Sequence, residues 1–219
     1  ALSQDPISEK LVFELKDCAL RFGASLHSVG NQSFNGSYHS ECWSLDQELE
    51  IAQRESLRLL AGMHQVDLCF LRPDFRPNDI RVLAMDMDST LINIECIDEI
   101  ANFTGKKSDV AAITEATMRG EIKDFKESLR RRVALLEGVS ADALEAVYKE
   151  RLRPNHGALE LLAGAHQHGL YTLLVSGGFT FFTEKLRMQL GFKQTQANTL
   201  EIIDGKLTGK VIGEIVDGV

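Results

Sequence analysis

The chain has 219 residues, of which 44% are hydrophobic, and its formal net charge is −8 at pH 7. This length is enough for one large hydrophobic core, or for a smaller core and an additional small domain. The acidic charge disfavours a nucleic-acid-binding protein, which normally carries a basic face, so an anionic substrate would have to be attracted by local positive groups.

The cysteines and the first residues bear on the cellular compartment. Cys18, Cys42, Cys69 and Cys96 form no C-x-x-C pair and no cluster with histidines. The amino-terminal stretch lacks the order of a signal peptide, and no apolar run approaches the roughly 20 residues that span a bilayer. We therefore expect reduced thiols in a cytoplasmic protein that binds neither membrane nor nucleic acid.

Residues 1–76 alternate between helical and strand patterns without a chemical motif. Leu11, Leu15 and Leu20 predict an amphipathic helix over residues 6–22. The further expected elements are a turn at 31–36, a strand at 42–45, a helix at 48–60 and a strand at 66–71. This order predicts a small α+β domain, with a regulatory and a packing role both open, and Pro73 and Pro77 mark a linker after it.

An apolar run at residues 82–85 breaks off into two aspartates, Asp86 and Asp88, which are followed by Ser89 and Thr90. Alternate side chains of a strand share one face, so both carboxylates should leave the strand on the same side. Two carboxylates this close favour a hard cation such as Mg²⁺. One of them could also attack an electrophile while the other transfers a proton.

Other interpretations of this Asp-x-Asp pattern depend on its neighbours. A solvated turn is the commonest meaning of the pattern by itself. An EF-hand loop needs Gly at its sixth position and Glu at its twelfth, where this chain has Leu91 and Ile97, so that interpretation fails. A metal site without a nucleophile fits both aspartates but leaves Ser89 and Thr90 unexplained.

The next segment is predicted to be almost entirely helical. The expected helices cover residues 94–103, 107–119, 122–136 and 141–152. Gly105, Gly120 and Gly138 separate them, as is typical between short helices. An insertion directly after a strand that carries two carboxylates would lie over the carboxyl end of the sheet, so we interpret this segment as a lid.

Helix and strand patterns then resume. We expect a helix at 158–169, a parallel strand buried on both faces at 170–175, and a helix at 179–190. Residues 198–213 alternate around Asp204-Gly205, which predicts a β-hairpin.

Ser176, Gly177 and Gly178 follow the predicted strand at 170–175. We expect the two glycines to open the following helix, where backbone N–H groups and the serine hydroxyl could bind phosphate oxygens. A flexible loop is the simpler meaning of such a triplet. Its position after a second parallel strand, where open α/β sheets bind ligands, favours the binding site.

Three segments together resemble the haloacid-dehalogenase superfamily and, within it, the phosphoserine phosphatase family. The first is Met-Asp-Met-Asp-Ser-Thr-Leu-Ile at residues 85–92 with residues 95–101, the second is residues 175–179, and the third is residues 128–133. The resemblance implies an α/β fold, with a Rossmann-like core of parallel strands at 77–93 and 153–219 and a helical cap at 94–152. Residues 1–76 would form the small α+β domain.

The resemblance also implies a chemistry, the hydrolysis of O-phosphoserine to serine and phosphate as the last step of serine biosynthesis. Asp86 would be the nucleophile that forms an aspartyl-phosphate, and Asp88 the proton donor and acceptor. Ser176 and Gly177 would bind the phosphate. Mg²⁺ would be held by Asp86 and by the backbone carbonyl of Asp88.

The cap would bind the amino-acid end of this small-molecule substrate. By match to the family's Arg-x-Arg-Val pattern, Arg132 would bind the substrate carboxylate, and Glu95 would accept from its ammonium group. The resemblance is compatible with a homodimer as the oligomeric state.

The chain departs from the family pattern after the hairpin. There the family has a lysine and then a Gly-Asp-Gly-Ala-Asn-Asp-like motif, whereas this sequence ends at Val219 before either. We therefore expect the carboxyl-terminal part of the core to be absent from this sequence. A non-catalytic phospho-ligand sensor, or another phosphatase or phosphotransferase of the superfamily, remains an alternative.

Overall fold

The computed structural model describes residues 1–34, 38–72 and 74–217. The chain divides into two compact units, Ala1–Arg76 (unit 1) and Pro77–Val219 (unit 2). None of the helices in the described part of the chain combines the length and the apolar character that crossing a bilayer requires.

Unit 1 is an α+β unit with one antiparallel sheet, in the strand order β1-β3-β2. Its elements are β1 (Leu2–Ser3), α1 (Glu9–Arg21), β2 (Leu26–Phe34), β3 (Tyr38–Leu45) and α2 (Ile51–Met63). Both expected helices are confirmed. Helix α1 begins where the Ser8 side chain accepts from the backbone N–H of Leu11 at 3.2 Å, a normal amino-terminal cap. The core of the unit contains Leu11, Leu15 and Leu57.

Three details of unit 1 differ from the prediction. Leu20 is 65% exposed, because the apolar stripe of α1 follows Leu11 and Leu15 and passes beside it. Residues 66–71 form no strand; Asp67 only exchanges two 2.8 Å backbone bonds with Leu2. The turn predicted at 31–36 is wrong for 31–34, which belong to β2, and its remaining residues lie outside the described ones.

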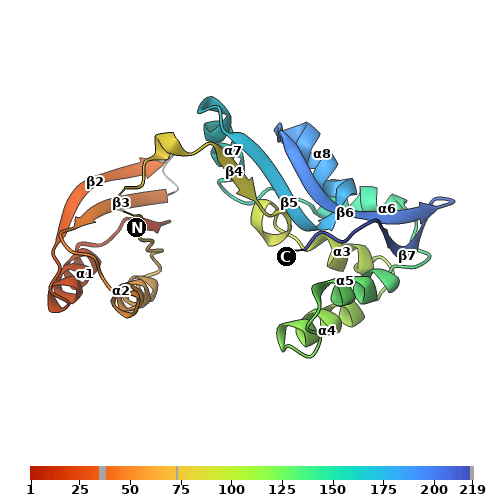
Figure 1. The fold of residues 1–219 in the computed structure, drawn as a ribbon, viewed down its shortest axis with the longest axis horizontal. Helices are drawn as coiled ribbons and strands as arrows, with labels where there is room; N and C mark the ends of the chain where they lie inside the picture. Colours follow the sequence, from red (N-terminus) through yellow and green to blue (C-terminus); the bar gives the residue numbers. More distant parts are fainter. Residues whose placement is uncertain (35–37, 73, 218–219) are drawn as a thin grey trace. The chain divides into compact units, whose positions relative to one another are not determined.

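Unit 2 has an α/β fold built on a four-stranded sheet in the order β4-β5-β6-β7, which Figure 1 shows with its helices. β4, β5 and β6 run parallel, and β7 is antiparallel to β6. The strands are β4 (Val82–Met85), β5 (Tyr171–Phe179), β6 (Gln194–Ile203) and β7 (Lys206–Ile212), and the helices along the sheet are α7 (Ala158–Gln167) and α8 (Thr180–Leu190). The predicted fold class and these two helices are confirmed.

The segment between β4 and α7 is helical, as predicted. It contains α3 (Cys96–Asn102), α4 (Lys107–Met118), α5 (Phe125–Ala134), α6 (Asp142–Ala146) and a π-helical turn (Val147–Arg151); a second π-helical turn (Met87–Leu91) follows β4, and a short 3₁₀ turn (Pro77–Asp79) precedes it. Buried apolar residues of this segment share one core with β5 and α8, and they include Ile100, Leu129 and Leu144.

The two ends of the inserted segment are fastened to each other. The backbone N–H of Asn93 donates to the carbonyl of Arg153 at 3.0 Å, and the N–H of Arg153 donates to Asn93 Oδ1 at 2.9 Å. The side chain of Asn155 donates to the carbonyl of Thr90 at 2.9 Å. The chain therefore leaves and re-enters the core through one paired connection.

Strand β5 is not buried on both faces as predicted. Thr172, Leu174 and Ser176 on one face are buried, but Tyr171 on the other face is 45% exposed and Val175 is 36% exposed. A run of apolar residues is compatible with one or two covered faces. In the described part of the chain only one face is fully covered.

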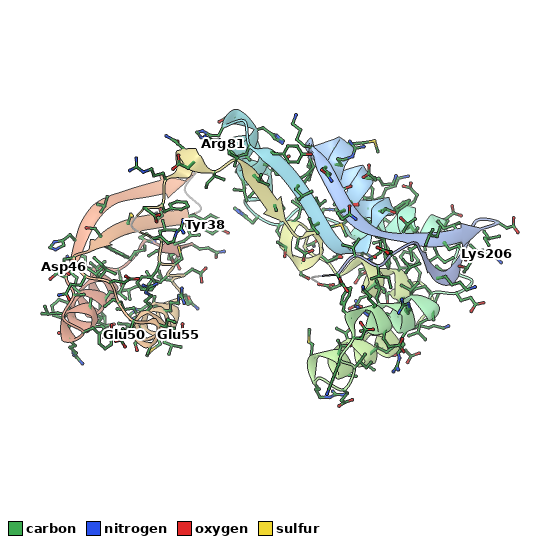
Figure 2. The ribbon with its side chains drawn as sticks, in the orientation of Figure 1. Tyr38, Asp46, Glu50, Glu55, Arg81 and Lys206 are labelled. Atoms are coloured by element: carbon green, nitrogen blue, oxygen red, sulfur yellow. The ribbon has the colours of Figure 1, made fainter. Side chains whose placement is uncertain are left out.

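The hairpin predicted around Asp204-Gly205 is confirmed, although β6 starts earlier than expected, at Gln194, where it joins the parallel sheet. Asp204 and Gly205 have positive φ angles of 49° and 74°, as a type I′ turn requires. Lys206 follows this turn, at the end of the hairpin in Figure 2. The hairpin also contacts the inserted segment, since Leu207 exchanges backbone bonds of 2.8 Å with Gly138 and Val139.

Candidate active site

Unit 2 contains a cavity of about 210 Å³ at the carboxyl ends of β4 and β5. Residues that follow β4 or end β5, here called the floor, are Asp86, Asp88, Ser176, Gly177, Gly178 and Phe179. The other lining residues come from the inserted segment and are called the lid wall: Glu95, Ile97, Phe125, Leu129 and Arg132. The cavity is smaller than a pocket for a drug-sized ligand, about 300–1,000 Å³, so it suits a small metabolite.

All six predicted site residues line this cavity, although they come from distant parts of the chain. Asp86 directly follows β4, and Asp88 lies in the tight turn that comes next, with the intervening Met87 fully buried. The buried Met87 anchors the turn in the core. Asp86 is exposed, whereas Asp88 is half-buried.

Asp88 is held by two donors from different elements. Its Oδ1 accepts from the backbone N–H of Cys96 at 3.0 Å, and its Oδ2 accepts from the Ser176 hydroxyl at 3.4 Å. Burial raises the pKa of Asp88 to about 6; the bond from Cys96 opposes this rise, while the charges of Glu95 and Asp86 add to it. A carboxyl group with such a pKa can hold a proton near neutral pH and release it, as a general acid and base must.

The residues at the end of β5 differ from the prediction. Gly177 and Gly178 do not open α8; they belong to β5, which continues to Phe179, and α8 begins at Thr180. The glycines serve close packing instead. A Cβ atom on Gly178 would lie 2.5 Å from Asp88 Oδ2, and one on Gly177 would lie 2.9 Å from the ring of Phe125.

The hydroxyl of Ser176 is part of this close packing. It accepts from the backbone N–H of Gly178 at 2.8 Å and donates to Asp88 Oδ2. The register of β5 against β6 shifts between Val175 and Phe179, so these peptide groups lie outside the regular ladder. They line the cavity and can supply backbone donors to a bound anion.

The charged residues of the lid wall are a base and an acid. Arg132, on α5, is half-buried, and its Nε donates to the carbonyl of Ser128 at 3.4 Å. Burial lowers the pKa of Arg132, and the charges of Asp98, Glu95 and Asp88 counteract this. The guanidinium therefore stays charged beside the cavity.

Glu95 precedes α3 and accepts a 2.6 Å bond from the hydroxyl of Ser89. Ser89 has a φ angle of 52°, which is in the left-handed region that a serine seldom adopts. Its position in the tight turn directs its hydroxyl to the carboxylate of Glu95.

Sequence reasoning missed Asn198, which belongs to β6 and is 1% exposed. Its side chain donates to the carbonyl of Gly177 at 2.8 Å and accepts from the backbone N–H of Val216 at 2.8 Å. The sequence signal for Asn198 was a polar residue within the alternating pattern of the predicted hairpin. That signal does not identify the partner, which depends on the register shift in β5.

The carboxylates of the floor bear on metal binding. In the described ranges of the chain, no group of three or more His, Cys, Asp and Glu side chains could hold a metal ion. Mg²⁺ does not need such a cage, because it commonly binds through one or two carboxylates and completes its shell with water and substrate phosphate. Asp86 and Asp88 therefore fit Mg²⁺ bound together with a phosphate ligand.

Comparison with known sequences gives a family and a set of relatives. The sequence profile of the haloacid dehalogenase-like hydrolases matches residues 83–219. A phosphoserine phosphatase from Polaromonas sp. (strain JS666) is 57% identical over 150 residues, which are 67% of this chain and 64% of the relative. The chain spans less than two thirds of the length of the first curated relatives that it matches.

Two solved structures show the same similarity in three dimensions. A structure described as a phospho-aspartyl intermediate analogue of phosphoserine phosphatase is 40% identical, with a TM-score of 0.57 over 62% of this chain and 64% of that one. A HAD family hydrolase from Salmonella enterica serovar Typhi is 27% identical, with a TM-score of 0.81, and the match covers 98% of this chain and 72% of that one.

Proposed function

The chain belongs to the haloacid dehalogenase-like hydrolase family, and we propose that the protein carrying it hydrolyses O-phosphoserine to serine and phosphate through an aspartyl-phosphate intermediate. One observation carries this proposal. A single small cavity brings two adjacent aspartates and the end of β5 together with Glu95 and Arg132. The aspartates and the end of β5 suit the phosphate ester of a substrate. Glu95 and Arg132 suit the ammonium and carboxylate groups of an amino acid.

Asp86 is the proposed nucleophile because it is the more exposed of the two aspartates. One of its oxygens forms a bond to phosphorus while the bond from phosphorus to the serine oxygen breaks. Asp88 gives its proton to the departing serine oxygen. In the second step Asp88 accepts a proton from the water that attacks the aspartyl-phosphate, which releases phosphate and restores Asp86.

The floor supplies the phosphate-binding groups. Ser176 and the peptide groups of Gly177 and Gly178 line the cavity next to Asp88. Asp86 and the backbone carbonyl of Asp88 would hold Mg²⁺, which supplies positive charge against the phosphate oxygens. The net charge of the chain is negative, so such local groups must attract the anionic substrate.

The lid wall supplies the specificity. The planar guanidinium of Arg132 can bind both oxygens of the substrate carboxylate, and Glu95 can accept from the ammonium group. An acid and a base on the same wall are what a zwitterion requires. We propose accordingly that residues 94–152 act as a helical cap that excludes bulk water from the reaction.

The proposal extends to a cytoplasmic enzyme of serine biosynthesis. A homodimer is a further hypothesis, and analytical ultracentrifugation of the full-length protein would test it.

The test uses the full-length protein that contains this chain. It should release phosphate from O-phosphoserine when Mg²⁺ is present and not when Mg²⁺ is removed by a chelator. Acid quenching during turnover, followed by mass spectrometry, should find a phosphoryl group on the peptide that contains Asp86. Binding of phosphoserine without phosphate release would support a sensor and contradict the proposed reaction.

A further inference from the structure

Asn198 has an amide group whose orientation is fixed from both sides. Its nitrogen donates to the carbonyl of Gly177, and its oxygen accepts from the N–H of Val216, each at 2.8 Å. A backbone carbonyl can only accept and a backbone N–H can only donate. The amide therefore has one orientation that satisfies both partners, and the residue is almost completely buried.

The register of the sheet explains why a side chain is needed here. Asn198 lies opposite Phe179 in the pairing of β6 with β5, and the pairing is shifted just before that point. The carbonyl of Gly177 falls within the shifted stretch, where β6 supplies no ladder partner. The side chain of Asn198 takes the place of the missing backbone N–H, because it donates to this carbonyl at 2.8 Å.

The bond from Asn198 orients more than one atom. The carbonyl of Gly177 and the N–H of Gly178 belong to the same planar peptide group and point in opposite directions. That N–H donates to Ser176 Oγ at 2.8 Å, and Ser176 donates onward to Asp88 Oδ2 at 3.4 Å. Asn198 is therefore connected through one peptide group and one hydroxyl to the proposed proton donor.

We propose that Asn198 is a positioning residue of the active site, which sets the orientation of the Gly177–Gly178 peptide and, through it, of the Ser176 hydroxyl. This inference rests on the proposed function of the same cavity. Asn198 does not line that cavity, so it acts on the phosphate side of the reaction only through Ser176 and the peptide.

The decisive variant is Asn198→Asp in the full-length protein. Aspartate keeps the size and the acceptor for Val216, but it replaces the donor to the Gly177 carbonyl with a second acceptor. We expect kcat/KM to fall at least tenfold, by the same factor on phosphoserine and on a phosphate monoester without the amino-acid end. Thr199→Val, at the exposed neighbouring position of β6, should change kcat/KM less than twofold on both.

A double-mutant cycle separates positioning from general damage. If Asn198 acts through this peptide and Ser176, Asn198→Asp should lower kcat/KM by a clearly smaller factor in the Ser176→Ala background than in the parent. If the two losses instead multiply, the inference is overturned. It is also overturned if Asn198→Asp retains kcat/KM within threefold of the parent.

Folding is checked by circular dichroism and thermal unfolding of each variant. If Asn198→Asp does not fold, Asn198→Ser takes its place in the same cycle, and a loss of the fold in both variants would assign Asn198 a structural role and overturn the inference. Failure of the proposed function is recognised separately, because the unsubstituted protein would then not act on phosphoserine. The cycle can in that case be measured with any phosphate monoester that the protein does hydrolyse.

Discussion

The floor and the lid wall of the cavity are held in different ways. On the floor, Asp88 is bonded to Ser176, which lies 88 residues away in the sequence. On the lid wall, Arg132 is bonded to Ser128 one helical turn earlier, and Glu95 to Ser89 six residues earlier. A bond between distant elements therefore fixes the proposed proton donor. The bonds of the lid wall connect each recognition group to a residue nearby in the sequence.

The largest expected effect comes from the floor. Asp86→Asn keeps the shape of the side chain and removes the nucleophile, so kcat should fall at least about 1,000-fold, about 4 kcal/mol in the barrier, while phosphoserine still binds. Phosphate release and isothermal titration calorimetry measure the two quantities. A loss of less than tenfold would show that Asp86 does not attack phosphorus, and the floor would then lose its chemical role.

A second prediction concerns the cost of burying Asp88. In the metal-free protein its pKa is about 6, compared with an unfolded value of 3.8. The folded state therefore binds this proton more tightly, and the resulting stability is complete below pH 3.8 and is lost as the pH rises through about 6. The charged form costs about 3 kcal/mol above that pH.

The variant Asp88→Asn removes this cost. In a chelator, its free energy of unfolding relative to the parent should be about 2 kcal/mol more favourable at pH 7 than at pH 4, because part of the cost is already present at pH 4; urea unfolding measures this difference. An equal difference at both pH values would mean that Asp88 is not destabilised by burial. The floor would then be a solvated surface and not a preorganised site.

Most of the floor could be predicted from local sequence, because its residues interrupt apolar strands. Asp86 and Asp88 directly follow one apolar strand, and Ser176 lies in another, so a carboxylate or hydroxyl stands out against its apolar neighbours. The turn at Asp204-Gly205 could also be predicted from the sequence, since few residue pairs adopt two positive φ angles.

The roles of Asn198 and of the two glycines depend on how the strands pair and pack, and no local sequence pattern shows this. Asn198 has its partner because β5 and β6 shift in register, and the glycines before Phe179 are needed because Asp88 and Phe125 pack against them. The exposed face of β5 could not be predicted either. An apolar run such as residues 170–175 does not show whether anything covers both of its faces.

The third prediction tests the recognition role of the lid wall. Arg132→Ala should lower kcat/KM on phosphoserine about 30-fold, about 2 kcal/mol, and by less than threefold on a phosphate monoester without the amino-acid end. The neighbouring Arg131 is a matched control, because it is exposed and pairs with Glu127 at 2.8 Å on the helix surface. Arg131→Ala should change either value less than twofold. Equal losses on both substrates from Arg132→Ala would show that it supports the fold of the cap.

The smallest expected effect concerns an ion pair between the helix of the lid wall and the end of the described chain. Lys126 Nζ lies 3.3 Å from Asp217 Oδ2, and the lysine side chain is 43% exposed. The Asp217 side chain is 12% exposed, so solvent screens this pair only from the lysine side. Lys126→Met should lower the free energy of unfolding by about 1 kcal/mol and change KM for phosphoserine less than twofold. Lys123→Met, at an exposed position before α5, is the control. If Lys126→Met alone raised KM more than tenfold, and 1 M salt raised the parent's KM equally, this pair would fix the lid wall over the floor. Long-range bonds would then hold both sides of the cavity, which would remove the difference between them.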